Sequence, residues 1–197
     1  IEIENLLFSD DTEVMINALI NLGVKIIINK ELKKCSIEGV NNFFPNKNAN
    51  LYIGNSGTTI RPLTAVLAFN KGKYFIHGTE RMHDRPIGDL VNSLNLIGAH
   101  IEYQNKSNYP PLIISESNFK NNKIEIKGNV SSQFLTSILI ASPILSIHDD
   151  IYINLIGDLI SQPYIEITLK LLKIFGLEVE IIKNNNYKTK FKQHYLN

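Results

Sequence analysis

The chain has 197 residues, of which 44% are hydrophobic, and its 20 basic and 19 acidic side chains leave a net charge of +1. Such a chain can bury a sizeable core, and the balanced charge, without a Lys/Arg run, gives no electrostatic reason to expect binding to nucleic acid or to a membrane. The single cysteine, Cys35, excludes an internal disulfide and favours a reduced, cytoplasmic setting. The longest apolar stretch, 134–147, is too short and too interrupted to span a bilayer. The first residues lack a signal-peptide pattern, and we expect the chain to begin within a strand.

Three segments along the chain, 10–28, 85–103 and 162–181, share one pattern. Each begins with polar residues or proline and continues for about three helical turns with apolar residues at i, i+3 and i+4. A glycine follows, Gly23, Gly98 or Gly176, and then an alternating stretch. This pattern predicts a helix, a glycine C-cap and a strand, three times over.

Two further segments predict a second type of helix between the first three. GTTIRPLTAVLA begins at Gly57 and VSSQFLTSILIAS at Val130, and both contain L-T-x-x-L, with Leu63 matching Leu135. In the first we expect Thr58 or Thr59 to cap the helix and Pro62 to lie in its first turn. A strand-and-helix unit repeated nearly three times explains both helix types.

The distribution of apolar residues predicts an α/β fold with helices inside and sheets outside. Residues 164–175 are apolar around most of the helix circumference, so we expect this helix to be enclosed by protein. The segments 74–78, 123–128 and 151–157 alternate as strands do. The segment 184–197 is polar without a clear period, and we expect a frayed tail.

Polar residues gather where four of these segments enter a helix. They occur in GNSGTTIRP from Gly54, in RMHDRPIG from Arg81, in SSQF from Ser131 and in GDLISQPYI from Gly157. If the units stack in parallel, the helix N-termini meet at one end and offer N–H groups, hydroxyls and guanidinium groups to an anion. Each cluster taken alone is also explained by ordinary capping or by a solvated surface, and we interpret His83 as a surface residue.

Five motifs, in order and spacing, resemble the N-terminal half of bacterial 5-enolpyruvylshikimate-3-phosphate synthase. They are LYIGNSGTTIRPL, ERMHDRPIGDLV, NYPPL, GNVSSQFLTSIL and GDLISQPYIEITLKLLKIFG, and the resemblance extends from LLFSDD to about Glu180. It implies an inside-out α/β domain of repeated βαβαββ units, with buried parallel helices and outer sheets. It also implies transfer of the enolpyruvyl group of phosphoenolpyruvate to the 5-hydroxyl of shikimate 3-phosphate, in the shikimate pathway, without a metal or an organic cofactor.

The resemblance also implies roles for individual residues. Shikimate 3-phosphate would be bound by Ser131, Ser132, Gln133, Ser161 and Tyr164. Phosphoenolpyruvate would be bound by Gly57, Arg85 and Gln133, with Asn55 and Arg61 shaping the loop around Gly57. No convincing general acid or base is present in these motifs, so we expect the proton-transfer groups outside this chain.

By comparison with the family pattern, we expect residues 1–183 to form most of one enolpyruvyl transferase domain, made of nearly three repeat units with the first unit truncated. We expect residues 184–197 to form the polar tail and the second domain to be absent. The chain alone would then be inactive, and a monomer. Two alternatives stay open: a non-catalytic remnant that at most binds shikimate 3-phosphate weakly, and the related transferase acting on UDP-N-acetylglucosamine. The second is disfavoured, because in that transferase we would expect a reactive cysteine near the arginine that binds phosphoenolpyruvate. The single cysteine of this chain, Cys35, is in an unrelated early segment.

Overall fold

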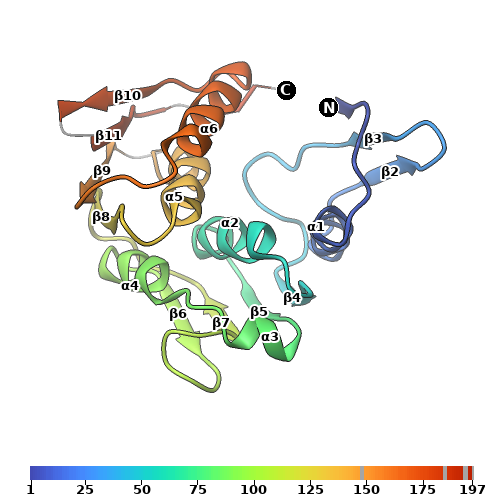
Figure 1. Ribbon diagram of the computed structural model, residues 1–197, viewed down its shortest axis with the longest axis horizontal. Coiled ribbons are helices and arrows are strands. Elements are labelled where there is room, and N and C mark those ends of the chain that lie inside the picture. Colours follow the sequence, from blue (N-terminus) through green and yellow to red (C-terminus); the bar gives the residue numbers. More distant parts are fainter. Residues whose placement is uncertain (147–148, 184–185, 193–194, 197) are drawn as a thin grey trace.

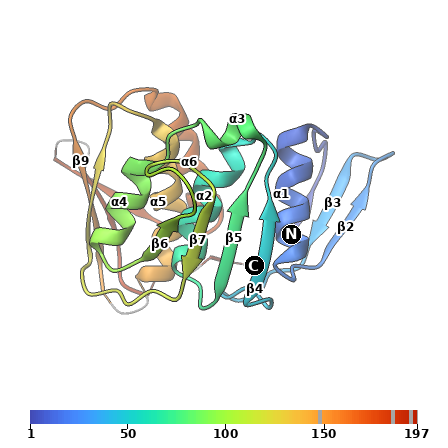
Figure 2. The ribbon, with the colours of Figure 1, turned by 90° about the horizontal axis from the view of Figure 1, so that it is seen from below.

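The computed structural model describes residues 1–146, 149–183, 186–192 and 195–196, and places three sheets around a group of helices (Figures 1 and 2). The helices are α1 (Asp10–Asn21), α2 (Gly57–Ala68), α3 (Glu80–His83), α4 (Gly88–Leu96), α5 (Ser132–Leu145) and α6 (Gln162–Ile174). The strands are β1 (Glu2–Ile3), β2 (Ile26–Asn29), β3 (Lys34–Ile37), β4 (Asn48–Tyr52), β5 (Lys73–His77), β6 (His100–Tyr103), β7 (Leu112–Ser115), β8 (Lys123–Lys127), β9 (Ile151–Ile156), β10 (Val179–Ile182) and β11 (Asn186–Thr189). In the described part of the chain, no helix has the length and apolar character needed to cross a bilayer.

Two parts of the chain have the same topology. One runs β4, α2, β5, α4, β6, β7, with the short α3 before α4, and the other runs β8, α5, β9, α6, β10, β11. The sheet orders are β4-β5-β7-β6 and β8-β9-β11-β10, and in each sheet only the first pair is parallel. Parallel neighbours need a crossover, which α2 and α5 supply. These are two copies of one βαβαββ unit, and the predicted α/β repeat is confirmed.

The first part of the chain matches the last four elements of that unit. It runs β1, α1, β2, β3, and its sheet has the order β1-β3-β2 with both pairs antiparallel. This is the order found for β5-β7-β6 and for β9-β11-β10. The three sheets therefore surround the helices with an approximate threefold relation (Figure 1).

The glycines that follow α1, α4 and α6 end their helices in the same way. Gly23, Gly98 and Gly176 have φ values of 90°, 111° and 81°, a left-handed conformation that glycine adopts without strain. The next N–H returns to the carbonyl five residues earlier, as in a Schellman motif. These bonds join Val24 to Leu19 at 3.0 Å, Ala99 to Leu94 at 3.0 Å and Leu177 to Leu172 at 2.9 Å.

The centre of the fold is the pair α2 and α5, which lie against each other (Figure 1). Their matching leucines, Leu63 and Leu135, are 3% and 1% exposed. The strand β8 shows how the sheets cover this centre, because Ile124 and Ile126 point inward and the lysines and glutamate between and beside them remain exposed. The predicted strands 74–78, 123–128 and 151–157 are confirmed as β5, β8 and β9.

The prediction that helix 164–175 is enclosed by protein is wrong. In α6, Ile165 and Leu172 are buried, but Ile167, Leu171 and Ile174 are 54%, 50% and 75% exposed. The helix packs mainly on α5 and β10, so a single face is covered. An apolar sequence shows what a helix is able to bury, and the number of neighbours decides what it does bury.

Part of the predicted tail is an inner strand of a sheet. In 184–197, the segment Asn186–Thr189 forms β11 and pairs with both β9 and β10. Tyr187 and Thr189 are buried, while Lys188 forms a 2.7 Å ion pair with Asp150. The expectation of a frayed tail is wrong for these four residues, because their alternation is hidden by a polar composition. Positions 184, 185, 193, 194 and 197 of that tail lie outside the described residues.

Candidate functional site

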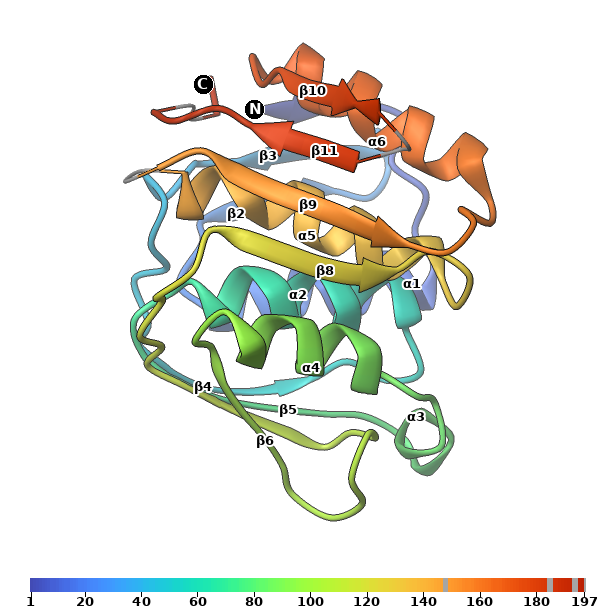
Figure 3. The same ribbon diagram turned by 90° about the vertical axis from the view of Figure 1, so that its left-hand side faces the viewer.

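The helix N-termini lie at one end of the molecule. In Figure 3 the arrowheads of β4, β8 and β9 point to the same side, where α3 also lies, and α2, α5 and α6 begin after these strands. A helix N-terminus presents unpaired N–H groups and a partial positive charge. The predicted gathering of polar helix starts at one end is therefore found in the fold.

The start of α5 is formed by the sequence SSQF. Ser131 is the N-cap, and its hydroxyl accepts a 3.3 Å hydrogen bond from the N–H of Gln133. Ser132 is the first helical residue and is 8% exposed, whereas Ser131 and Gln133 are half-buried. Ser131 thus caps the helix in the ordinary way, and the hydroxyl of Ser132 and the amide of Gln133 sit in the first turn beside it.

The start of α6 is less ordinary. Its N-cap, Ser161, has φ 55° and ψ 40°, and its side chain makes no capping hydrogen bond. A left-handed non-glycine residue costs roughly 1–2 kcal/mol, and such residues cluster at functional sites. Tyr164 lies one turn into the helix and is 66% exposed, so its phenol is accessible to a ligand.

One hollow of about 870 Å³ joins these two helix starts. It lies between α1, α2, α5 and α6, and the five residues predicted for shikimate 3-phosphate, namely Ser131, Ser132, Gln133, Ser161 and Tyr164, all line it. Thr58 of α2 lines it as well.

Two threonines that the sequence analysis did not select join α5 to α6 inside this hollow. The hydroxyls of Thr136 and Thr168 lie 3.2 Å apart, and Thr168 also donates to the Tyr164 carbonyl at 2.8 Å. Thr136 occupies the threonine position of the L-T-x-x-L repeat. The repeat could therefore have drawn attention to Thr136, whereas no sequence pattern marks Thr168.

A second cluster, formed by Asn55, Gly57, Arg61 and Arg85, occupies the start of α2. The Arg85 guanidinium donates to the Asn55 carbonyl through Nη1 at 2.7 Å. The Thr79 N–H donates to the Gly54 carbonyl at 2.9 Å, which ties the segment of α3 to the loop before α2. Four of the predicted residues are in this way brought together from two distant parts of the sequence.

Helix α2 begins earlier than predicted. Its N-cap is Ser56 and its first residue is Gly57, so neither Thr58 nor Thr59 caps it and Pro62 lies in the second turn. A proline there removes the hydrogen bond to the Thr58 carbonyl. The glycine at the first helical position leaves space that the arginines fill: a β-carbon on Gly57 would overlap Nη1 of Arg61 and lie 2.7 Å from Nη2 of Arg85.

Arg61 is the most unusual charged residue of the cluster. It is 6% exposed, and its Nε and Nη1 atoms are buried without a hydrogen-bond partner in the part of the chain that the structure describes. Burial, and secondly the charge of Arg85, lower the pKa of Arg61 to about 10, so it stays protonated at neutral pH. Among the described residues, the ion pairs include neither Arg61 nor Arg85. Two adjacent guanidinium groups and a helix N-terminus therefore form an uncompensated positive region.

His83 has a local structural role. Its Nε2 atom accepts a hydrogen bond of 3.4 Å from the N–H of Gly78, at the end of β5. The side chain is half-buried, and its ring lowers the pKa of His77, after the larger effect of burial.

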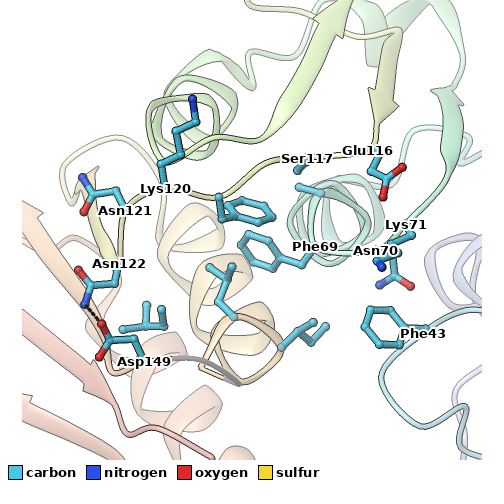
Figure 4. Close-up of a pocket in the computed structure, with 15 residues that line it drawn as sticks. Phe43, Phe69, Asn70, Lys71, Glu116, Ser117, Lys120, Asn121, Asn122 and Asp149 are labelled. Atoms are coloured by element: carbon cyan, nitrogen blue, oxygen red, sulfur yellow. Dashed lines mark hydrogen bonds between the residues drawn. The ribbon is translucent and has the colours of Figure 1, made fainter.

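A separate pocket of about 450 Å³ lies at the opposite ends of α2 and α5 (Figure 4). Phe69 and Phe119 meet edge to face in it with ring centroids 4.9 Å apart, and Asn122 donates to Asp149 at 3.1 Å. Helix C-termini present carbonyl oxygens, which disfavour an anion. None of the residues predicted to bind substrate lines this pocket, so it is not the candidate site. Within the described residues, no group of three or more His, Cys, Asp or Glu side chains is placed to hold a metal ion.

Comparisons with known proteins bear on the family of this chain. The family model described as EPSP synthase (3-phosphoshikimate 1-carboxyvinyltransferase) matches residues 1–196. A 3-phosphoshikimate 1-carboxyvinyltransferase of Janthinobacterium sp. (strain Marseille) is 50% identical over 194 residues, which are 98% of this chain and 44% of that protein. The protein of the same name from Herminiimonas arsenicoxydans is 51% identical over 179 residues, 91% of this chain and 40% of that protein. This chain therefore spans less than half the length of these curated relatives.

The fold agrees as well. A solved EPSP synthase from Acinetobacter baumannii superimposes with a TM-score of 0.80 at 22% sequence identity, over 99% of this chain and 42% of that one. At this identity the likeness concerns the fold alone. Because the family model covers nearly the whole sequence, the assignment does not depend on the structural comparison: the chain belongs to the EPSP synthase family.

Proposed function

We propose that this chain supplies the shikimate 3-phosphate half-site of an enzyme that transfers the enolpyruvyl group of phosphoenolpyruvate to the 5-hydroxyl of shikimate 3-phosphate. The observation that carries the proposal is the hollow at the starts of α5 and α6, which all five residues of the predicted half-site line. The curated relatives bear the name of this activity.

The chemistry of the hollow suits a phosphorylated cyclohexene with a carboxylate. Hydroxyl and amide groups of Ser132, Gln133 and Ser161 donate charge-assisted hydrogen bonds to phosphate oxygens, and the helix N-termini add favourable electrostatics. The exposed ring of Tyr164 offers both an apolar face and a hydroxyl to the substrate. These groups bind and orient the acceptor.

We propose the cluster of Gly57 and Arg85 as the phosphoenolpyruvate subsite, with Gln133 reaching both substrates. Arg85 is held by the Asn55 carbonyl through Nη1 at 2.7 Å, which leaves its other donors for a carboxylate or phosphate. The positive region at the start of α2 favours an anion with more than one charge.

In this proposal, a second domain supplies the groups for proton transfer and covers the open side of the substrate site. The hollow offers hydroxyls and amides but no group with a pKa suited to general acid–base catalysis, so a second domain supplies those groups. We propose that the active unit is a monomer containing both domains, that it works in the cytoplasm, and that this chain alone is inactive.

The alternative acceptor, UDP-N-acetylglucosamine, has less support. Cys35 lies in β3, is 2% exposed, and is the only cysteine of the sequence. A buried thiol in that sheet is not available to react beside Arg85. A non-catalytic binding domain differs from the proposed half-site only in its partner, so activity after addition of the second domain separates these two.

Calorimetric titration with shikimate 3-phosphate tests the proposal. We expect binding to the wild-type chain, and at least a tenfold weaker binding after Ser132→Ala with Gln133→Ala, since hydrogen bonds to charged groups contribute about 1.5–3 kcal/mol each. Ser107→Ala with Gln104→Ala changes the same residue types in an exposed loop and serves as the control. Absence of binding by the wild type at millimolar ligand rejects the half-site.

A further inference from the structure

Within the described residues, the guanidinium of Arg61 has an unusual environment. The residue is 6% exposed in helix α2, and among the described residues neither Nε nor Nη1 has a hydrogen-bond partner. Buried arginines that hold a fold together are paired, because a buried charge without a partner is strongly unfavourable. Among the described residues, the charge that acts on Arg61 is that of Arg85, which repels it.

The buried charge of Arg61 lies at the start of α2. Its Nη1 atom lies directly beside Gly57, the first residue of α2, on the side where a β-carbon would otherwise project. Nη2 of Arg85 lies on the same side, 2.7 Å from that β-carbon position. Two guanidinium groups thus flank one helix N-terminus of a twelve-residue helix, and no acidic residue occupies its first turn.

We propose that Arg61 is a positioning residue of the phosphoenolpyruvate subsite that selects anions carrying more than one negative charge. It acts through Arg85. The two guanidinium groups repel each other, and this repulsion holds the Arg85 guanidinium against the Asn55 carbonyl, where its other donors are available to the ligand. It also raises the positive potential at the start of α2, where its buried charge is poorly screened by water.

This inference rests on the proposed function and adds a prediction about ligand charge. A fixed positive charge attracts a ligand in proportion to the ligand's own charge. Loss of Arg61 therefore weakens the binding of phosphoenolpyruvate more than the binding of pyruvate. Phosphoenolpyruvate carries a phosphate and a carboxylate, whereas pyruvate carries the carboxylate alone. If Arg61 were purely structural, its removal would weaken the binding of both ligands by the same factor.

Thermal unfolding of the 197-residue chain with each ligand provides the test. The variants are Arg61→Met, which keeps the length and removes the charge, and Arg61→Lys, which keeps the charge. Arg81→Met removes an exposed guanidinium from the neighbouring α3 and is the control. Phosphoenolpyruvate and pyruvate are titrated separately, and shikimate 3-phosphate is titrated as a third ligand.

We expect phosphoenolpyruvate to raise the Tm of the wild type and of Arg81→Met at lower concentrations than pyruvate does. Without ligand, Arg61→Met keeps or increases the wild-type Tm, because an unpaired buried charge has been removed. The same variant needs at least about tenfold more phosphoenolpyruvate for an equal shift, while its response to pyruvate changes much less. Arg61→Lys recovers most of the response.

Several results would overturn the inference. These are a lower Tm or failure to fold for Arg61→Met, an equal loss of the response to both anions, an unchanged preference for phosphoenolpyruvate, or no recovery with lysine. A wild type that responds to shikimate 3-phosphate but not to phosphoenolpyruvate overturns the role of Arg61 and leaves the proposed half-site intact. A wild type that responds to none of the ligands rejects both.

Discussion

Substitution of Gly57 by alanine tests the geometry at the start of α2. The methyl group would overlap Nη1 of Arg61 and lie 2.7 Å from Nη2 of Arg85, whereas ordinary contact begins at 3.4 Å. Arg85 must therefore move by about 0.7 Å or more. A shift of this size away from the Asn55 carbonyl would weaken the 2.7 Å hydrogen bond that Arg85 donates to it.

The expected effect on stability is small. Overpacking costs about 1–3 kcal/mol when the surroundings are rigid, but a guanidinium is the flexible end of its side chain. Alanine also favours the helix by up to about 1 kcal/mol relative to glycine, and these two effects offset each other. We therefore expect the Tm to change by only a few degrees.

The expected effect on binding is larger. Displacing Arg85 removes a charge-assisted hydrogen bond to the ligand, worth about 1.5–3 kcal/mol, so the Kd for phosphoenolpyruvate rises by roughly 10- to 100-fold. The Kd for shikimate 3-phosphate stays unchanged, because its proposed ligands start α5 and α6. Calorimetry with both substrates measures the two effects.

Gly88→Ala is the matched control for this prediction. Gly88 is likewise the first residue of its helix, α4, and a β-carbon there would overlap the side chain of Asn108 instead of an arginine. An unchanged affinity of Gly57→Ala for phosphoenolpyruvate would refute the reasoning. An equal loss for both substrates would refute it as well, because the damage would then extend beyond the arginine cluster.

Three further predictions concern stability. Leu172→Ala in α6 leaves a cavity and lowers the free energy of unfolding by about 2–5 kcal/mol, whereas Leu171→Ala, one residue away and 50% exposed, costs far less; urea unfolding of both compares them, and equal losses would contradict the packing of α6. Ser161→Gly relieves the left-handed strain and gives a Tm at or above that of Ser161→Ala, and a clearly lower Tm would mean that the strain is absent. Lys188, by hydrogen bonding to Asp150, lowers the pKa of that carboxyl below 3.8, so its ion pair stabilises the fold above this pH and the contribution disappears as the pH falls; Asp150→Asn should lower the Tm at pH 7 but not at pH 2, and a loss independent of pH would contradict the pairing.

The helical repeat was predictable because it depends on local chemistry. Gly23, Gly98 and Gly176 follow an apolar pattern at the same distance each time, and a left-handed C-cap requires glycine wherever the chain leaves a helix this way. Strands with clear alternation, such as β8, were predictable for the same reason. The strand β11 was not, because Lys188 and Thr189 obtain their partners, Asp150 and Ser142, from distant parts of the chain.

The candidate site was predictable in its residue types and only partly in its arrangement. SSQF and Ser161 carry capping chemistry that places them at helix starts, and the parallel stacking of the units then brings them to one hollow. The packing of α2 decides that Arg61 is buried and that, among the described residues, its Nε and Nη1 atoms have no hydrogen-bond partner. From the sequence alone, Arg61 is therefore expected only to shape the loop around Gly57, and the burial of its charge is not predictable.

The position of bound shikimate 3-phosphate is the most direct test of the account. Titration of the isotopically labelled 22.3 kDa chain, followed by amide chemical shifts, reports where the ligand binds. We expect the largest changes at Ser132, Gln133 and Tyr164, on two helices that share one hollow. Changes centred on Phe69 and Phe119, in the pocket at the opposite helix ends, or no changes at millimolar ligand, would contradict it.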